Sequence, residues 1–165
     1  MRKRTEPQPL RGLASLTVGL GPGFVAGTTV DLAIETSWEA LGAVIRDGAT
    51  LPFAGEPRTI DGHARDRYVY APVGGLFRTE RHIGDAVTAG ETVAHIDGTA
   101  LAAPLDGRLR GLIRDGVPVG SDTKVIEVDP RGERAIVTGI GERPGSIADG
   151  VLAVVRQWAS ASSKR

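Results

Sequence analysis

Glycines and a carboxylate with the potential to contact a ligand gather in the first 36 residues. The stretch VGLGPGFVAG contains Gly19, Gly21 and Gly23, and the apolar run LASLTV leads directly into it. Glycine lets the backbone turn its N–H groups towards an anion, and a preceding strand would place the loop at a sheet edge, as in dinucleotide sites. Glu35 and Thr36 end the next strand pattern and can hydrogen-bond a ligand near the loop. These five residues are the candidate cofactor-binding residues.

The same loop also has the sequence of a plain tight bend. Pro22 removes a backbone donor, no lysine is present to meet a phosphate, and no helical pattern follows. Glu35 has an alternative too, because a carboxylate at a strand end is commonly solvated. The sequence therefore leaves two interpretations open, a structural bend and a contact to an anion or a pterin phosphate.

Other catalytic or metal chemistry has little support. His63, His82 and His95 lack metal-ligand spacing, and the chain has no cysteine, which excludes thiolate catalysis and Cys-ligated metals. No Gly-x-Ser-x-Gly elbow occurs. We therefore predict no catalytic residue and no metal site.

Composition limits the function classes further. Lys plus Arg equals Asp plus Glu at 20 each, so no overall charge draws the protein to nucleic acid or an anionic membrane. No run approaches the roughly 18 apolar residues that span a bilayer, and MRKRTEPQPL lacks the apolar segment of a signal peptide. We expect a cytoplasmic protein that binds neither nucleic acid nor membrane.

Many short strands should form the elements that position these residues. The chain has 23 glycines and 10 prolines but only 4% aromatic residues, a balance typical of strands joined by turns. We expect a mainly β fold with a flexible start at 1–10, a β-rich unit with the glycine loop at 11–62, a sandwich at 63–130, a C-terminal strand and helix at 131–160, and a frayed tail at 161–165.

Three segments carry the more specific expectations. TTVDLAIET alternates as a half-buried strand, and WEALGAVI is predicted as a strand although its apolar spacing also fits a helix. In RPGSIADGVLAVVRQWAS, Ser146 is the expected N-cap of a helix. Its apolar face would consist of Ile147, Val151, Val154, Val155 and Trp158.

An internal repeat is the strongest signal, and it appears when residues 71–97 are laid over 103–129. APVGGLFR matches APLDGRLR, and GDAVTAGETVAHID runs beside DGVPVGSDTKVIEVD with a small shift around the turn. Asp85 and Asp115 lie in glycine-containing turns, where aspartate side chains cap backbone N–H groups. Because neither half can bury its apolar face alone, the two must pack together as a pseudo-symmetric β-sandwich.

IGDAVTAGETVAHIDG followed by LAAPLDGRLRGLIRDGVPV resembles the lipoyl and biotinyl carrier domains over residues 68–129. This resemblance implies a barrel-sandwich hybrid of two interlocked hairpin motifs. In those carriers the modified lysine lies on the hairpin turn between the halves, which here is Asp97-Gly98-Thr99-Ala100. No lysine is there, and Lys124 falls in the final strand of the second repeat. The resemblance thus implies a carrier-like scaffold without a covalent cofactor.

A longer resemblance includes the opening loop. VGLGPGFVAG, IET, LGAVI, DGAT, GDAVTAGETVAHIDGT, RGLIRDG and VDPRG occur in this order over residues 14–155, and the set is similar to the accessory proteins of selenium-dependent molybdenum hydroxylase systems. That family implies a non-catalytic role in maturing hydroxylases of the xanthine dehydrogenase type, with a non-covalent molybdopterin-type cofactor as the implied ligand. The sequence departs from the family after IET, where Ser37-Trp38-Glu39-Ala40 replaces a polar stretch.

The family usually has an upstream nucleotide-binding-like unit, which this sequence does not include. The resemblance therefore implies either a hydroxylase subunit or a separate nucleotide-binding-like protein as the partner. Two other function classes stay open. One is a small enzyme that binds a nucleotide or anion with the GLGPG loop, and the other is a structural adaptor of the carrier-sandwich type, although such adaptors usually have long heptad helices.

Overall fold

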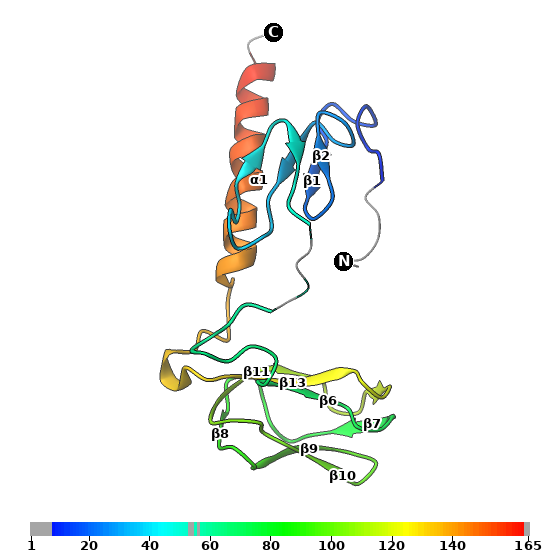
Figure 1. Cartoon of the computed structure of the whole chain (residues 1–165), viewed down its shortest axis with the longest axis vertical. Helices are drawn as coiled ribbons and strands as arrows, with labels where there is room; N and C mark the ends of the chain where they lie inside the picture. Colours follow the sequence, from blue (N-terminus) through cyan, green and yellow to red (C-terminus); the bar gives the residue numbers. More distant parts are fainter. Residues whose placement is uncertain (1–7, 53–54, 56, 164–165) are drawn as a thin grey trace. The chain divides into compact units, whose positions relative to one another are not determined.

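The computed structural model describes residues 8–52, 55 and 57–163. The chain divides into two compact units, which we call unit 1 and unit 2 (Figure 1). Unit 1 comprises Met1–Gly55 and Ile140–Arg165, and unit 2 comprises Glu56–Gly139. The C-terminal helix therefore belongs to the same unit as the N-terminal strands. The boundary between unit 1 and unit 2 after Gly55 lies before the boundary expected after residue 62.

Unit 1 consists of short strands and one long helix. Its elements are β1 (Val18–Leu20), β2 (Val25–Ala26), β3 (Leu32–Ile34), β4 (Val44–Ile45), β5 (Gly48–Ala49) and α1 (Glu142–Ser162). One sheet has the order β1-β3-β4, and β2 pairs with β5 in a second, two-stranded sheet. β1 and β3 run parallel with Val18 beside Leu32, whereas β3 and β4 are antiparallel.

Two layers cover the β1-β3-β4 sheet. On one face, Ala33 packs into a cluster with Ala26 and Val30, against which Phe24 also packs. On the other face, α1 packs against β3 and β4 and buries Gly150 and Val154. The alternation of side chains along β3 therefore directs Ala33 to one layer and Ile34, which lies beside Gly150, to the helix.

Several local expectations for unit 1 need correction. The first strand begins only at Val18, so Gly19 belongs to β1 and not to the loop. WEALGAVI is mostly turn, with only Val44–Ile45 in a strand, because the chain folds back here and the Gly42 amide donates to the Glu35 carbonyl at 2.9 Å.

The helix was correctly expected, but both of its ends differ from the prediction. It begins at Glu142 with Gly141 as N-cap, so Ser146 lies inside it and caps nothing. The helix also continues to Ser162, into the expected tail. Residues 164–165 and most of the expected flexible start, residues 1–7, lie outside the described residues. Within 8–10, the Leu10 amide donates to the Thr29 carbonyl at 2.7 Å.

Unit 2 is built from two four-stranded antiparallel sheets and contains no closed barrel among its described residues. Its elements are β6 (Tyr68–Tyr70), β7 (Gly75–Arg78), β8 (Ala86–Val87), β9 (Thr92–Ile96), β10 (Thr99–Ala102), β11 (Gly107–Leu112), β12 (Pro118–Val119), β13 (Lys124–Asp129) and the 3-10 turn η1 (Gly132–Arg134). The sheets have the orders β10-β9-β7-β12 and β6-β13-β11-β8. The chain is thus mainly β with one C-terminal helix.

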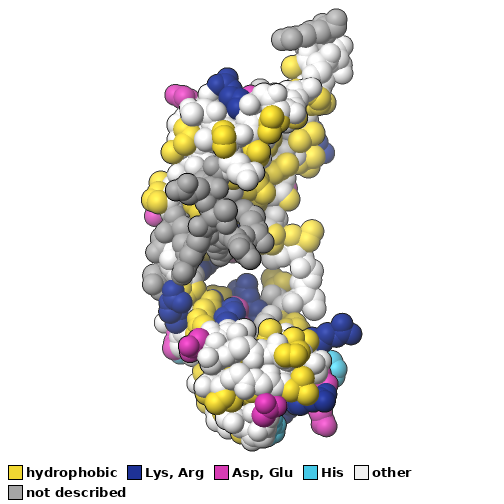
Figure 2. Space-filling model, turned by 90° about the vertical axis from the view of Figure 1, so that its right-hand side faces the viewer, with side chains coloured by type: hydrophobic (Ala, Val, Ile, Leu, Met, Phe, Trp, Pro, Cys, Tyr) yellow, Lys and Arg dark blue, Asp and Glu magenta, His cyan; other side chains and the backbone are white. Residues whose placement is uncertain are grey.

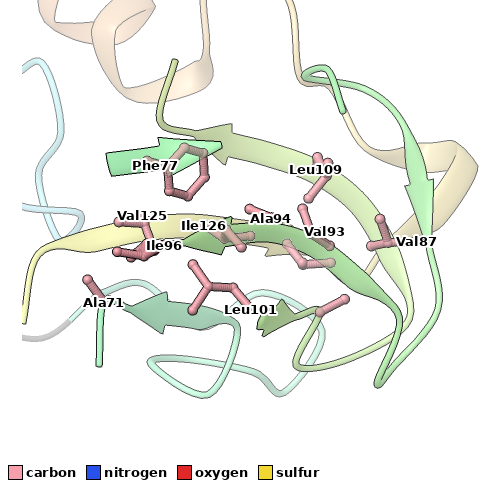
Figure 3. Close-up of a cluster of buried hydrophobic side chains, with 12 residues drawn as sticks. Ala71, Phe77, Val87, Val93, Ala94, Ile96, Leu101, Leu109, Val125 and Ile126 are labelled. Atoms are coloured by element: carbon pink, nitrogen blue, oxygen red, sulfur yellow. The ribbon is translucent and has the colours of Figure 1, made fainter. Parts of the chain in front are cut away.

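The core of unit 2 lies between these sheets (Figure 3). Phe77, Ile96 and Leu101 come from one sheet, and Leu109 and Ile126 from the other, and all five are at most 3% exposed. The alternation of apolar and polar residues along the strands accounts for this one-sided burial. Two sheets with a shared apolar core agree with the expected mainly β fold.

The repeat is confirmed with a constant offset of 32 residues and no shift at the turn. Matching strand starts are Gly75 and Gly107, Ala86 and Pro118, and Thr92 and Lys124. Hydrogen bonds between the halves are reciprocal, since the Phe77 amide donates to the Val117 carbonyl at 3.0 Å and the Leu109 amide to the Asp85 carbonyl at 2.9 Å. β7 pairs with β12 and β11 with β8, so each half completes a sheet of the other.

The strand expected within 131–160 is absent from the described residues, where η1 is followed by irregular chain up to α1. β13 ends at Asp129, and the next residue, Pro130, has no amide donor with which to continue the strand pairing. In the described part of the chain, no helix combines the length and apolar character needed to cross a membrane.

Candidate functional site

The candidate cofactor-binding residues all lie in unit 1, and four of them lie at one sheet edge. Because β1 and β3 are parallel, their carboxyl ends meet, and ligands of α/β sheets commonly bind outside such ends. Gly21 and Gly23 follow β1, and Glu35 and Thr36 follow β3. A Cβ placed on Gly21 would lie 3.3 Å from the Thr36 hydroxyl oxygen, so the two segments are in direct contact.

Gly19 serves packing within the unit. A Cβ at this position would lie 2.3 Å from the ring of Phe24, which approaches the strand closely. Since real Cβ atoms do not approach so near, any other residue at position 19 would displace the ring from the cluster of Ala26, Val30 and Ala33. The close approach of the Phe24 ring therefore accounts for a glycine at position 19, and no ligand contact is needed to explain it.

Glu35 is the most tightly held residue of the site. Its side chain is buried, and the residue is 2% exposed. Oε1 accepts hydrogen bonds from the amides of Thr36 and Ser37, both at 2.7 Å, and Oε2 accepts one from the Leu51 amide at 2.7 Å. The interpretation as a solvated carboxylate is wrong, because three otherwise unpaired backbone donors draw the group inside.

Arg143 joins this edge to the helix. From the first turn of α1, its Nε and Nη2 donate to the Thr36 carbonyl at 3.1 and 2.9 Å. This contact could not be predicted from the sequence, because the two residues lie 107 positions apart and no motif links them. The result is a continuous network in which Glu35 fixes the Thr36 amide and Arg143 fixes its carbonyl.

The carboxylate of Glu35 and the guanidinium of Arg143 are hydrogen-bonded to backbone groups of unit 1. In the part of the chain that the structure describes, the single buried side-chain nitrogen or oxygen without a hydrogen-bond partner is Nε of Arg67, in unit 2. The described edge in unit 1 therefore holds no buried polar side-chain atom without a partner. The predicted contact of Gly19, Gly21, Gly23, Glu35 and Thr36 with a cofactor stays a prediction.

Among the described residues, no three His, Asp or Glu side chains are grouped to hold an ion.

The segment that the carrier resemblance aligns with a modified lysine forms a two-residue hairpin turn in unit 2. Asp97 and Gly98 join β9 to β10 with φ values of 44° and 87°, as a type I′ turn requires. Asp97 Oδ1 accepts a hydrogen bond from the Leu76 amide at 3.1 Å. Lys124 lies on β13 as predicted, with its Nζ 2.6 Å from Oε2 of Glu127 and 4.0 Å from the ring centre of Tyr68.

A charged cluster surrounds Glu127 and Asp129 of β13, and Asp129 is fully buried. Arg67 and Lys124 donate to Glu127, and Arg110 and Arg131 donate to Asp129 at 3.1 and 2.7 Å. Hydrogen bonding from Arg131 lowers the pKa of Asp129 to about 2. Burial alone would raise the pKa of Glu127, but the hydrogen bonds from Lys124 and Arg67 outweigh it and lower this pKa.

The two turn aspartates act as predicted. Asp85 accepts from the His82 amide at 2.9 Å, and Asp115 accepts from the Thr79 amide at 3.0 Å. The Thr79 amide bond is the largest cause of a lowered pKa at Asp115. Both carboxylates therefore cap backbone donors, which is a structural role.

Comparison with known protein families gives no match for the chain. Among curated proteins, it is 39% identical over 143 residues to a protein of Escherichia coli (strain K12) described as uncharacterized protein YqeB. The match takes in 85% of this chain and 26% of YqeB, so the chain spans about a quarter of the length of this relative. This description of YqeB names no activity.

Proposed function

We propose that the chain is a non-catalytic binding module that assists the maturation of molybdenum hydroxylases. Within this proposal, unit 2 is a barrel-sandwich hybrid of the lipoyl and biotinyl carrier type. The reciprocal pairing of β7 with β12 and of β11 with β8 supports this assignment, because it is how two interlocked hairpin motifs would pair.

The observation that carries the proposal is the hairpin turn at Asp97 and Gly98. A covalent amide to lipoate or biotin needs a primary amine at this tip, and the turn has none. Lys124 does not replace it, since its ammonium group is paired with Glu127 and lies against Tyr68. A carrier scaffold without its acceptor amine is suited to binding another protein and not to moving a bound group.

The choice of client depends on the ordered motifs between residues 14 and 155, which resemble accessory proteins of molybdenum hydroxylase systems. We propose a hydroxylase subunit, or a separate nucleotide-binding-like protein, as the partner, met in the cytoplasm. The relative YqeB adds no functional description to this choice.

The enzyme alternative is less well supported by the geometry. Both carboxylate oxygens of Glu35 accept backbone amides, and a Phe24 ring covers Gly19, so neither residue is left to bind a nucleotide or an anion. The adaptor alternative lacks long paired helices in the part of the chain described, where α1 is the single α-helix.

Co-purification tests the proposal. The tagged chain is mixed with a purified molybdenum hydroxylase lacking its cofactor, and the retained subunits and any pterin fluorescence are measured. A folded lipoyl carrier domain serves as the matched control, because it shares the proposed sandwich but not unit 1. We expect the hydroxylase to be retained by the chain and not by the control, with an intact mass showing an unmodified chain. Equal recovery from both, or an acyl group on Lys124, would contradict the proposal.

A further inference from the structure

The sheet of unit 1 ends in an unpaired strand edge at β1. The Leu32 amide donates to the Thr17 carbonyl at 3.2 Å, and the Gly21 amide donates to the Ile34 carbonyl at 3.0 Å. Backbone groups alternate sides along a strand, so Gly19 also faces β3, whereas Val18 and Leu20 direct their N–H and C=O groups to the other side. Among the described residues, none is hydrogen-bonded to those outward groups.

The helix-side face of the sheet is also only partly covered at this edge. The parallel register sets Leu20 beside Ile34 and Val18 beside Leu32, so these side chains share the face on which Ile34 meets α1. A helix about 10 Å wide covers about two strands spaced about 4.8 Å apart. Because α1 packs against β3 and β4, Val18, Leu20 and Leu32 are left half-buried.

Parallel strands are normally buried on both faces, so an apolar and unpaired parallel edge is unusual for a free surface. Unit 1 has further exposed apolar side chains, and several hydrophobic groups are visible on its side turned to the viewer in Figure 2, which is the side away from α1 in Figure 1. Leu152, Val155 and Trp158 of α1 are each more than 40% exposed. Such surfaces commonly contact another protein.

We infer that a β-strand from a polypeptide corresponding to the part of YqeB outside the matched segment pairs with the outer edge of β1, and that an apolar element of the same polypeptide covers Val18, Leu20 and Leu32. Addition of a strand uses main-chain hydrogen bonds for affinity and the alternate side chains for specificity. In YqeB about three quarters of the chain lies outside the matched segment, so this segment is accompanied by a much larger polypeptide there. A second copy of this chain would offer only the same three-residue strand.

This inference goes beyond the proposed function and holds without it, because it names a surface and a mode of pairing and not a client. Because the inferred strand pairing uses backbone N–H and C=O groups, amide hydrogen exchange measures it directly. The amides of Val18 and Leu20 should exchange rapidly in the protein alone, whereas the amide of Gly21, which is bonded to Ile34, should be protected.

The probe is a polypeptide made from the part of Escherichia coli YqeB that lies outside the matched segment. On its addition, we expect the exchange of the Val18 and Leu20 amides to slow by about tenfold or more, with Gly21 unchanged. The variant Leu20→Pro removes one outward donor and should weaken binding of the probe by about tenfold, more than Leu20→Ala does. Val44→Pro, on the opposite edge of the same sheet, is the matched control and should bind normally.

Three results would overturn the inference. Protection of both amides that grows with the concentration of this protein alone would show a second copy at the edge. Equal binding by Leu20→Pro and Leu20→Ala would show that the backbone is not used. If the probe does not fold, full-length YqeB decides, because rapid exchange at its positions aligned with Val18 and Leu20 would show that the remaining chain does not cover this edge.

Discussion

Replacing Glu35 with glutamine tests whether this residue holds the fold or awaits a ligand. The carboxylate accepts three backbone amides at 2.7 Å, two on Oε1 and one on Oε2. Glutamine has one carbonyl oxygen, so it keeps the bonds to Thr36 and Ser37 but turns an NH₂ group towards the Leu51 amide. Glu35→Gln therefore leaves a buried backbone donor facing another donor.

The expected loss can be estimated from these contacts. A buried donor without an acceptor costs about 1–3 kcal/mol, and the two remaining bonds lose the strengthening supplied by the negative charge. We therefore expect Glu35→Gln to lower the free energy of unfolding of unit 1 by about 2–4 kcal/mol. Glu39→Gln is the matched control, because the same change four positions later affects an exposed side chain.

Urea unfolding followed by tryptophan emission provides the assay. Both tryptophans, Trp38 and Trp158, belong to unit 1, and both tyrosines, Tyr68 and Tyr70, belong to unit 2. Tryptophan emission therefore reports unit 1 alone, and tyrosine emission reports unit 2. A Glu35→Gln variant that unfolds at the same urea concentration as Glu39→Gln would refute the structural role and restore the ligand interpretation.

Three further predictions concern packing, charge and the hairpin tip. Gly150→Ala should destabilise unit 1 by about 2 kcal/mol, because the new Cβ would lie 2.4 Å from a loop carbonyl oxygen, whereas Gly145→Ala meets only ordinary contacts and should be neutral or stabilising. The lowered pKa of Asp129, about 2, stabilises unit 2 above pH 4 by about 2 kcal/mol, so tyrosine-detected stability should fall as the pH drops from about 4 to about 2, and less steeply in Asp129→Asn. Thr99→Lys places an amine on the exposed first residue of β10, next to the hairpin turn and without a positive φ, and a lipoate or biotin ligase should modify this variant but not the parent chain.

A different result would contradict each of these three predictions. Equal stability of Gly150→Ala and Gly145→Ala would show that α1 does not approach the loop closely. An unchanged acid slope in Asp129→Asn would show that other carboxylates govern the acid loss. Failure of both ligases on a folded Thr99→Lys variant would count against the carrier-type arrangement of unit 2.

The sequence was most informative in unit 2, where the repeat supplies its own internal check. The match of residues 71–97 with 103–129 predicted two equivalent halves, and the strands follow it at a constant offset. The hairpin at Asp97 and Gly98 was also predictable, because only a few residue pairs suit two successive positive φ values. The two equivalent halves and the hairpin turn both depend on short segments of sequence, which is why they could be predicted.

Unit 1 was less predictable because its contacts join distant segments. The parallel pairing of β1 with β3 leaves no short-range pattern in strands of three residues. The burial of Glu35 depends on the Leu51 amide 16 residues later, and the bond from Arg143 to Thr36 crosses 107 positions. The start of α1 was missed because Gly141 is an N-cap without a side-chain hydrogen bond, whereas Ser146 has the preferred residue type.

We propose that this chain binds a molybdenum hydroxylase directly and without a covalent group. Calorimetric titration of the unmodified chain with a purified, cofactor-free hydroxylase tests this proposal. We expect a saturable complex with a Kd of about 1 µM or tighter, a binding free energy of about −8 kcal/mol. No binding at about 100 µM of either protein would contradict it.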